Sequence, residues 1–185
     1  MDYSRRQFFN SFKRVIDRAV EQPRAKKKTI ALKMLRPPGA IEESQFLEKC
    51  TRCTDCIEAC PYDSIRRIGP EFGEAAGTPA IIYNDTPCYI CPDMPCIASC
   101  ETEALLPIER HEARMGTATI DYNNCWQAMN QPCDYCVTKC PLKSDAISMD
   151  EIQLPRVDTN GCVGCGVCAY LCPGDAITIV AAEVK

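Results

Sequence analysis

The sequence predicts an α+β fold in which two small modules follow a helical arm. Three observations support this. All 16 cysteines fall into four groups of four, short segments rich in Ile, Val and Thr separate the groups, and the first 40 residues are basic. With 185 residues, five Phe and one Trp, the chain can form one ordinary domain or two very small ones. We therefore expect an arm over residues 1–40 and a folded body over 41–185, with metal–thiolate bonds supplying much of its stability.

The arm is predicted to be a basic amphipathic helix followed by a tether. In residues 4–20 apolar side chains recur at helical spacing, basic ones lie opposite, and Ser4 is a suitable N-cap. Residues 21–40 contain a Lys run and two consecutive prolines, which favour extended backbone.

Charge is divided unevenly along the chain. Residues 1–36 hold 11 Lys/Arg and 3 Asp/Glu, whereas the remainder holds 10 and 22, so a basic arm precedes an acidic body. We expect residues 4–20 to dock on an anionic membrane surface or an acidic partner, and not on nucleic acid, which the body would repel. Packing of the arm on its own body is the alternative.

The location depends on residues 4–9, SRRQFF, which are similar to a twin-arginine export signal. Charged residues follow in place of an apolar run, and no small-residue cleavage site is recognisable. We predict a cytoplasmic protein, peripheral to the inner face of the membrane, with no stretch of the ~20 apolar residues that a spanning helix needs. A periplasmic location through a degenerate twin-arginine signal is the alternative.

The spacing of the cysteines indicates iron–sulfur chemistry. The first and last groups follow the pattern Cys-x2-Cys-x2-Cys-x3-Cys-Pro of bacterial [4Fe–4S] proteins, and the two middle groups are looser versions. Disulfides suit short secreted chains, and zinc sites have no use for a third closely spaced cysteine or for the proline. The four runs, each predicted to ligate a [4Fe–4S] cluster, are Cys50, Cys53, Cys56 and Cys60; Cys88, Cys91, Cys96 and Cys100; Cys125, Cys133, Cys136 and Cys140; and Cys162, Cys165, Cys168 and Cys172.

Four runs predict two bacterial 2[4Fe–4S] ferredoxin-like modules, because in such modules the fourth cysteine of a run ligates the other cluster. Since the first and last runs resemble each other, we expect a nested arrangement, with an outer module (about 41–75 plus 150–185) and an inserted module (about 76–149). Sequential pairing of neighbouring runs is the alternative. The nested ligand sets are Cys50, Cys53, Cys56 and Cys172; Cys162, Cys165, Cys168 and Cys60; Cys88, Cys91, Cys96 and Cys140; and Cys125, Cys133, Cys136 and Cys100.

Short elements are predicted around the runs. A helix over residues 41–49 leads into the first run. Strands are expected after the runs at 64–68, 104–108, 146–149 and 176–180, and before them at 80–83, 118–122 and 155–158.

Several short motifs outside the spacing carry a family resemblance. They are LRPPGAI at 35–41, CTRC at 50–53, CPYD at 60–63, AAGTP at 75–79 and ARMG at 113–116. With the cysteine spacings, they make residues 35 to about 180 similar to the NapG/MauM-type ferredoxins of periplasmic nitrate reductase and methylamine-utilisation systems. The resemblance implies four [4Fe–4S] clusters that pass electrons from a membrane quinol-oxidising iron–sulfur partner towards a periplasmic molybdenum reductase.

The predicted function is electron transfer. The sequence lacks a glycine-rich phosphate loop, a nucleophile paired with a base, and a flavin, pterin or nicotinamide motif, so we expect no small-molecule substrate and no enzyme activity of its own. The main hypothesis is a relay of single electrons between a membrane quinone-linked iron–sulfur protein and a soluble reductase or dehydrogenase. The alternatives are a permanent subunit of a cytoplasmic hydrogenase or formate dehydrogenase, a maturation factor for a molybdenum enzyme and, last, a structural zinc protein.

Overall fold

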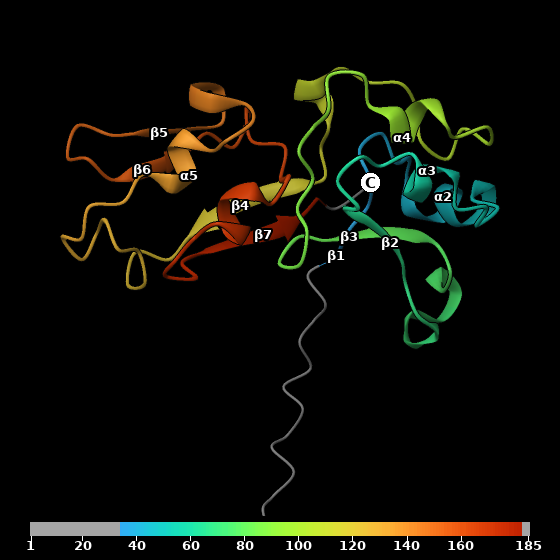
Figure 1. The fold of residues 1–185 in the computed structure, drawn as a ribbon, viewed down its shortest axis with the longest axis horizontal. Coiled ribbons are helices and arrows are strands. Elements are labelled where there is room, and N and C mark those ends of the chain that lie inside the picture. The colour runs from blue at the N-terminus through green and yellow to red at the C-terminus, as the bar shows by residue number, and fades with distance from the viewer. Residues whose placement is uncertain (1–33, 183–185) are drawn as a thin grey trace, which may run out of the picture. The chain divides into compact units, whose positions relative to one another are not determined.

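The computed structural model describes residues 34–182. The predicted helix over 4–20 and residues 21–33 of the predicted tether lie outside the described residues. From residue 34 the chain forms part of one compact unit that mixes short helices with short strands (Figure 1). Within 34–182, every helix is too short or too polar to cross a membrane.

The body begins earlier than the predicted boundary at residues 40 and 41. Strand β1 (Met34–Leu35) pairs antiparallel with β3 (Pro79–Ile82), and the Leu35 side chain is buried. Residues 34–40 therefore belong to the folded body, which corrects the predicted tether. Its prolines are compatible with this role, since an extended segment can join a sheet edge as readily as it can span a gap.

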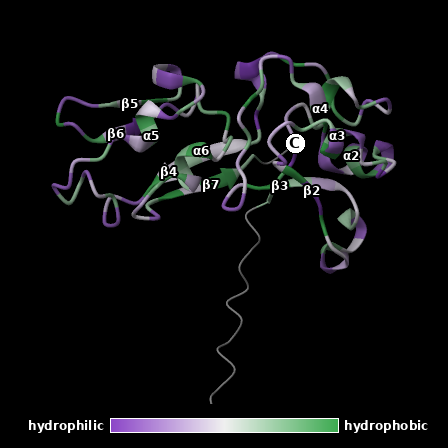
Figure 2. Cartoon of the chain, in the orientation of Figure 1, coloured by the Kyte–Doolittle hydropathy of each residue, from purple (hydrophilic) through white to green (hydrophobic). Residues whose placement is uncertain are grey.

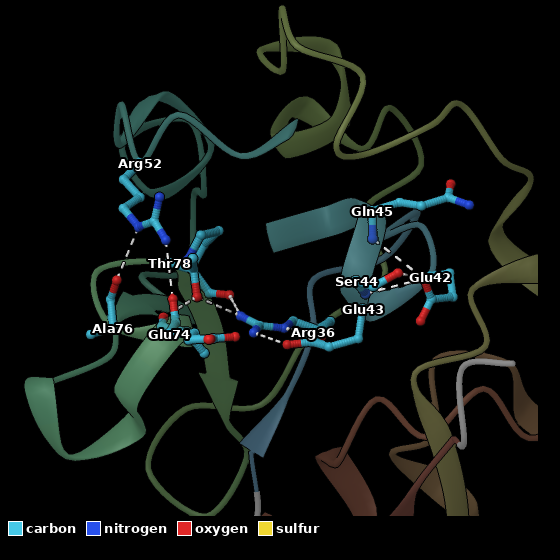
Figure 3. A network of polar contacts seen from close by, with 11 residues as sticks. Arg36, Glu42, Glu43, Ser44, Gln45, Arg52, Glu74, Ala76 and Thr78 are labelled. Carbon is cyan, nitrogen blue, oxygen red and sulfur yellow. Dashed lines mark hydrogen bonds and ion pairs between the residues drawn. The ribbon is translucent and has the colours of Figure 1, made fainter. Parts of the chain in front are cut away.

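Arg36 fixes this segment in place. Its guanidinium pairs with Glu43 and donates to Thr78 Oγ1 at 2.8 Å and to the Pro79 carbonyl at 2.9 Å (Figure 3). It also lies 4.6 Å from the centre of the Phe46 ring. The side chain is only 9% exposed. A buried charge needs partners, and these contacts supply them.

Module 1 is the part of the body from residue 34 to 108. Its three-stranded antiparallel sheet has the order β1-β3-β2. The predicted helix over 41–49 is confirmed as α2, which begins at Glu43 because the Glu42 carboxylate caps the N–H groups of Ser44 and Gln45 (Figure 3). The other elements are α3 (Asp55–Glu58), β2 (Ile65–Arg67), η1 (Pro70–Ala75) and α4 (Pro95–Ala98).

One predicted strand of module 1 is reduced to a single contact. In place of a strand over 104–108, only Leu105 pairs, with Ala40. Pro107 lacks the N–H group that a longer ladder would need, which explains why the strand ends there.

Module 2 spans residues 116–182, after a connector that contains η2 (Arg110–Glu112). Strand β4 pairs antiparallel with β7, from Gly116↔Ala181 to Ile120↔Ile177, and β5 pairs with β6. The strands predicted near 146–149, 155–158 and 176–180 are confirmed, whereas β4 lies two residues before the predicted 118–122. Its elements are β4 (Gly116–Ile120), α5 (Tyr135–Thr138), η3 (Lys143–Asp145), β5 (Ile147–Met149), β6 (Pro155–Val157), α6 (Val167–Tyr170) and β7 (Ile177–Ala181).

The modules follow chain order, so the nested arrangement is wrong. Helix α3 of the first run packs against α4 of the second, and α5 of the third run packs against α6 of the fourth. Consecutive elements of a chain usually lie next to each other, and here every run packs against one of its neighbours in the chain. Similarity between the first and last runs reflects a shared local geometry and says nothing about which runs pack together.

The apolar core is continuous through both modules. It contains Phe46 and Tyr83 from module 1 and Val163 and Ile179 from module 2. Figure 2 shows apolar colour on β3, β4 and β7, the strands that supply part of this core. Buried cysteines of all four runs lie among or beside these side chains.

Candidate metal centres

Four cavities of the described residues are each lined by four cysteines. Three cysteines of each cavity come from one run, and the fourth comes from the neighbouring run in the same module. We name them site A (Cys50, Cys53, Cys56 and Cys100), site B (Cys60, Cys88, Cys91 and Cys96), site C (Cys140, Cys162, Cys165 and Cys168) and site D (Cys125, Cys133, Cys136 and Cys172).

The structure brings each predicted set of three cysteines together but replaces its fourth member. Cys100 joins Cys50, Cys53 and Cys56 where Cys172 was predicted, and the other three sets change in the same way. The fourth cysteine of each run follows its short helix by two residues, so it points at the run whose helix packs alongside. The predicted exchange between runs is therefore present, but between neighbours in the chain.

The cysteine loops share an unusual backbone conformation. In three runs the residue before the second cysteine has a positive φ: Arg52 (61°), Ile90 (49°) and Gly164 (72°). This conformation is unfavourable for a β-branched residue, yet Ile90 adopts it while only 1% exposed. In the third run the equivalent position is Pro132, whose ring fixes a negative φ. The wider spacing of that run thus goes with a different loop conformation.

A second turn recurs after each fourth cysteine. The third residue beyond it has a positive φ in all four runs: Asp63, Glu103, Lys143 and Asp175. A backbone N–H group just beyond this residue donates to the cysteine sulfur in three of the runs. The donor is one residue beyond it for Ser64 to Cys60 at 3.4 Å and Ala176 to Cys172 at 3.3 Å, and two residues beyond it for Leu105 to Cys100 at 3.4 Å. In the second run, where Glu101 stands in place of the proline, the positive φ is kept at Glu103 but the donor to the sulfur is shifted by one residue.

Burial and mutual repulsion act on the thiols of each site. Burial, followed by repulsion from the nearby Cys50, Cys53 and Cys100, raises the pKa of Cys56 to about 12. Burial likewise raises the pKa of Cys96 to about 11, with Cys60 adding to the effect, and that of Cys136 to about 12. Four thiolates can share such a cavity only if positive charge lies among them, as the iron ions of a cluster would supply.

The distribution of four cysteines around each cavity indicates a group larger than one ion. Among residues 34–182, no three His, Cys, Asp or Glu side chains lie close enough to share a single ion, and all 16 cysteines are free thiols. The residues present therefore fit a multinuclear cluster at each site.

The widened spacing between Cys125 and Cys133 forms a closed loop. The Met129 N–H donates to the Cys125 carbonyl at 3.1 Å, and the Cys133 N–H donates to Gln127 Oε1 at 2.9 Å. Trp126 lies against Gly174, where a Cβ would come within 3.0 Å of its ring. This loop keeps Cys125 buried at site D in spite of the insertion.

Sequence reasoning missed the role of Arg52 at site A. Its guanidinium donates to the Ala76 carbonyl at 3.0 Å and to the Glu74 carbonyl at 3.1 Å (Figure 3). These bonds hold the end of η1 against the cysteine loop. The sequence shows a charged residue inside a cysteine run, which could have indicated this role. The two carbonyl groups that it binds, however, lie more than 20 positions further along the chain.

Comparisons with known proteins agree with this chemistry. The family model described as "4Fe-4S binding domain" (Fer4) matches residues 46–66 and 155–178, which hold the first and fourth runs. The ferredoxin-type protein NapG of Escherichia coli (strain K12) is 39% identical over 151 residues, covering 75% of this chain and 65% of that protein. The methylamine utilization ferredoxin-type protein MauM of Methylobacillus flagellatus is 38% identical over 152 residues, covering 77% and 65%.

A second MauM, from Methylorubrum extorquens, is 39% identical over 153 residues, which cover 76% of this chain and 68% of that protein. The chain thus spans about two thirds of the length of the curated relatives it matches. An identity of 38–39% over these lengths is high enough to establish common descent. The protein with these four cysteine-lined sites belongs to the NapG/MauM family of ferredoxin-type proteins.

Proposed function

We propose that the chain binds one [4Fe–4S] cluster at each of sites A to D and relays single electrons through them. The observation that carries this proposal is the presence of four cavities, each lined by four cysteines in the same arrangement. A cluster supplies the one-electron chemistry, while the chain supplies the thiolates, the N–H donors to sulfur and the exclusion of water.

Each module has the features of a bacterial 2[4Fe–4S] ferredoxin. Two runs exchange their fourth cysteines, and the chain before the first run pairs antiparallel with the chain after the second, through β4 and β7 in module 2 and through Ala40 and Leu105 in module 1. The proposed protein is thus two such ferredoxins in sequence.

For the partners, we propose a membrane quinone-linked iron–sulfur protein on one side and a soluble reductase or dehydrogenase on the other. The family supports a role in such a chain, and two of the relatives are named for methylamine utilization. Residues 4–20, whose charge is opposite to that of the body, are proposed to dock on an anionic membrane surface or on one of these partners.

Anaerobic purification with chemical analysis tests the cofactors. We expect about sixteen irons and sixteen acid-labile sulfides per chain, four of each for every [4Fe–4S] cluster, with the EPR spectrum of such clusters after reduction. A colourless preparation that contains zinc and lacks iron would overturn the proposal and support a structural zinc protein.

Cell fractionation with protease treatment of spheroplasts tests the predicted location at the inner face of the membrane. We expect the protein to stay protected inside and to be released from membranes by salt, because the proposed contact of residues 4–20 is electrostatic. Digestion of the protein at the outer face would overturn this location and favour a periplasmic reductase as partner.

A further inference from the structure

The cysteine loops of sites B and C touch each other directly. The backbone N–H of Cys88, which lines site B, donates to the carbonyl of Cys165, which lines site C, at 3.0 Å. The two sulfurs are therefore connected through the side chains and backbones of two site residues and a single hydrogen bond. Electron tunnelling weakens with every bond and every gap along its route, so this is a short route between the modules.

Tyr83 braces this contact. It lies directly after β3, its side chain is fully buried, and its hydroxyl accepts the N–H of Ile179 in β7 at 3.1 Å. The backbone of Gly166 passes against it, since a Cβ at Gly166 would lie 2.4 Å from the Cβ of Tyr83. Gly166 follows Cys165, and Tyr83 precedes Cys88 by five residues, so the brace stands beside the cysteine contact in both modules.

Exposure distinguishes site A from the other three sites. Its Cys53 is exposed, whereas every cysteine of sites B, C and D is buried or half-buried. Sites A and B share module 1 and sites C and D share module 2, so the contact between B and C leaves A and D as the two ends.

We propose that electrons pass in the order A, B, C, D or the reverse, that the step between modules uses the Cys88–Cys165 hydrogen bond, and that Tyr83 is the positioning residue that holds the two loops together. In this step one electron leaves site B, which is oxidised, and enters site C, which is reduced, while no covalent bond forms or breaks. External one-electron donors and acceptors exchange with sites A and D. The inference rests on the proposed four clusters.

Double substitutions test the order. In the variant Cys53→Ala with Cys133→Ala, only sites B and C keep four cysteines; in Cys91→Ala with Cys168→Ala, only A and D do. After reduction with dithionite, we expect EPR to show magnetic interaction between neighbouring clusters in the first variant and none in the second. The reverse result, with about half of the iron retained in each variant, would overturn the order. Wild-type protein without iron–sulfur clusters would instead overturn the proposed function.

Tyr83→Phe tests the brace while all cysteines remain. The buried N–H of Ile179 loses its acceptor, so its hydrogen exchange should accelerate by about ten-fold or more. Iron content should stay unchanged, and the magnetic interaction between the clusters of sites B and C should weaken while that within each module persists.

Tyr89→Phe is the matched control, because it removes the hydroxyl of the residue next to Cys88, from a partly exposed ring that stacks on Tyr62. An unchanged interaction between B and C in Tyr83→Phe, or an equal loss within module 1, would remove Tyr83 from the positioning role. This result also decides the role of Tyr83 if the double variants fail to bind iron.

Discussion

In module 2 the first and last strands, β4 and β7, pair along their whole length, whereas in module 1 the corresponding segments meet only at Ala40 and Leu105. Module 1 adds β1 beside β3 and fastens it with Arg36. The cysteine sites nevertheless have the same composition in both modules. Cysteine geometry therefore depends on the loops and short helices, and the surrounding sheet can vary.

The cysteine loops of the two modules also differ in sequence. Module 2 uses Gly164 at the left-handed position before the second cysteine of its last run, while module 1 uses Arg52 and Ile90 at the equivalent positions. Glycine adopts this conformation without strain, and the other two residues are held there by hydrogen bonds or by burial. Different residues thus support one loop conformation. Substitutions in each module can test how strongly its cysteine sites depend on the surrounding residues.

The largest effect is expected from removing a fourth cysteine, which belongs to different sites in the nested and the observed pairing of the runs. Cys100→Ala should remove the cluster of site A, with a loss of about four irons, and should increase hydrogen exchange around Cys50–Cys56 while residues 125–136 stay protected. Hydrogen exchange with mass spectrometry measures both regions. Cys172→Ala is the matched variant and should expose 125–136 instead. Increased exchange near 125–136 in Cys100→Ala would support nested ligand sets.

Gly164→Ala should have the next largest effect. Its φ is 72°, and an added Cβ would lie 2.4 Å from the Gly116 backbone, so both strain and a clash oppose the change. We expect a loss of about 2–4 kcal/mol in stability and weaker cluster binding at site C. Gly73→Ala is the control for backbone strain without a clash, because Gly73 has φ 59° with open space around its Cβ position, and it should cost about 1–3 kcal/mol. Denaturant unfolding under anaerobic conditions measures both, and equal losses would show that the clash is relieved.

Arg36→Ala should destabilise module 1 by about 3 kcal/mol, because it removes the buried guanidinium together with its bonds to Glu43, Thr78 and the Pro79 carbonyl. Hydrogen exchange should accelerate in β2 and β3 and remain slow in β4 and β7. Lys49→Ala is the control, since its ion pair with Glu103 is exposed and should contribute less than about 1 kcal/mol. Equal acceleration in both modules would contradict the local role of Arg36.

Asp150→Asn should have the smallest effect. The hydrogen bond from Arg156 and that from the Leu154 N–H lower the pKa of Asp150 below its ordinary 3.8. Its contribution is therefore present above that value and is lost as the pH falls through the lower, folded-state pKa. At pH 7 we expect faster hydrogen exchange of Ile152 and Leu154, with iron content unchanged. NMR detects this change, and an effect on site A would contradict it.

The sequence by itself determined which cysteines share a loop. In the first and last runs, spacing of two residues holds three sulfurs within one loop, and the two looser runs keep the same grouping along the chain. The helix at Glu43 and most of the strands beside the runs also follow from local sequence. The fourth cysteine could not be assigned in this way, because it depends on which helices pack together. The packing of α3 against α4 and of α5 against α6 decided that pairing, and similarity between runs was a misleading guide.

Other features were decided by tertiary structure alone. Arg36 lies in a proline-rich stretch that predicts a tether. In the folded chain its guanidinium pairs with Glu43 and with Thr78, which directly precedes β3. The meeting of Cys88 with Cys165, and of Tyr83 with Ile179, joins positions 77 and 96 residues apart. Local spacing determines the chemistry of each site, whereas the order of the sites depends on packing between distant segments, because no local pattern encodes which loops will meet.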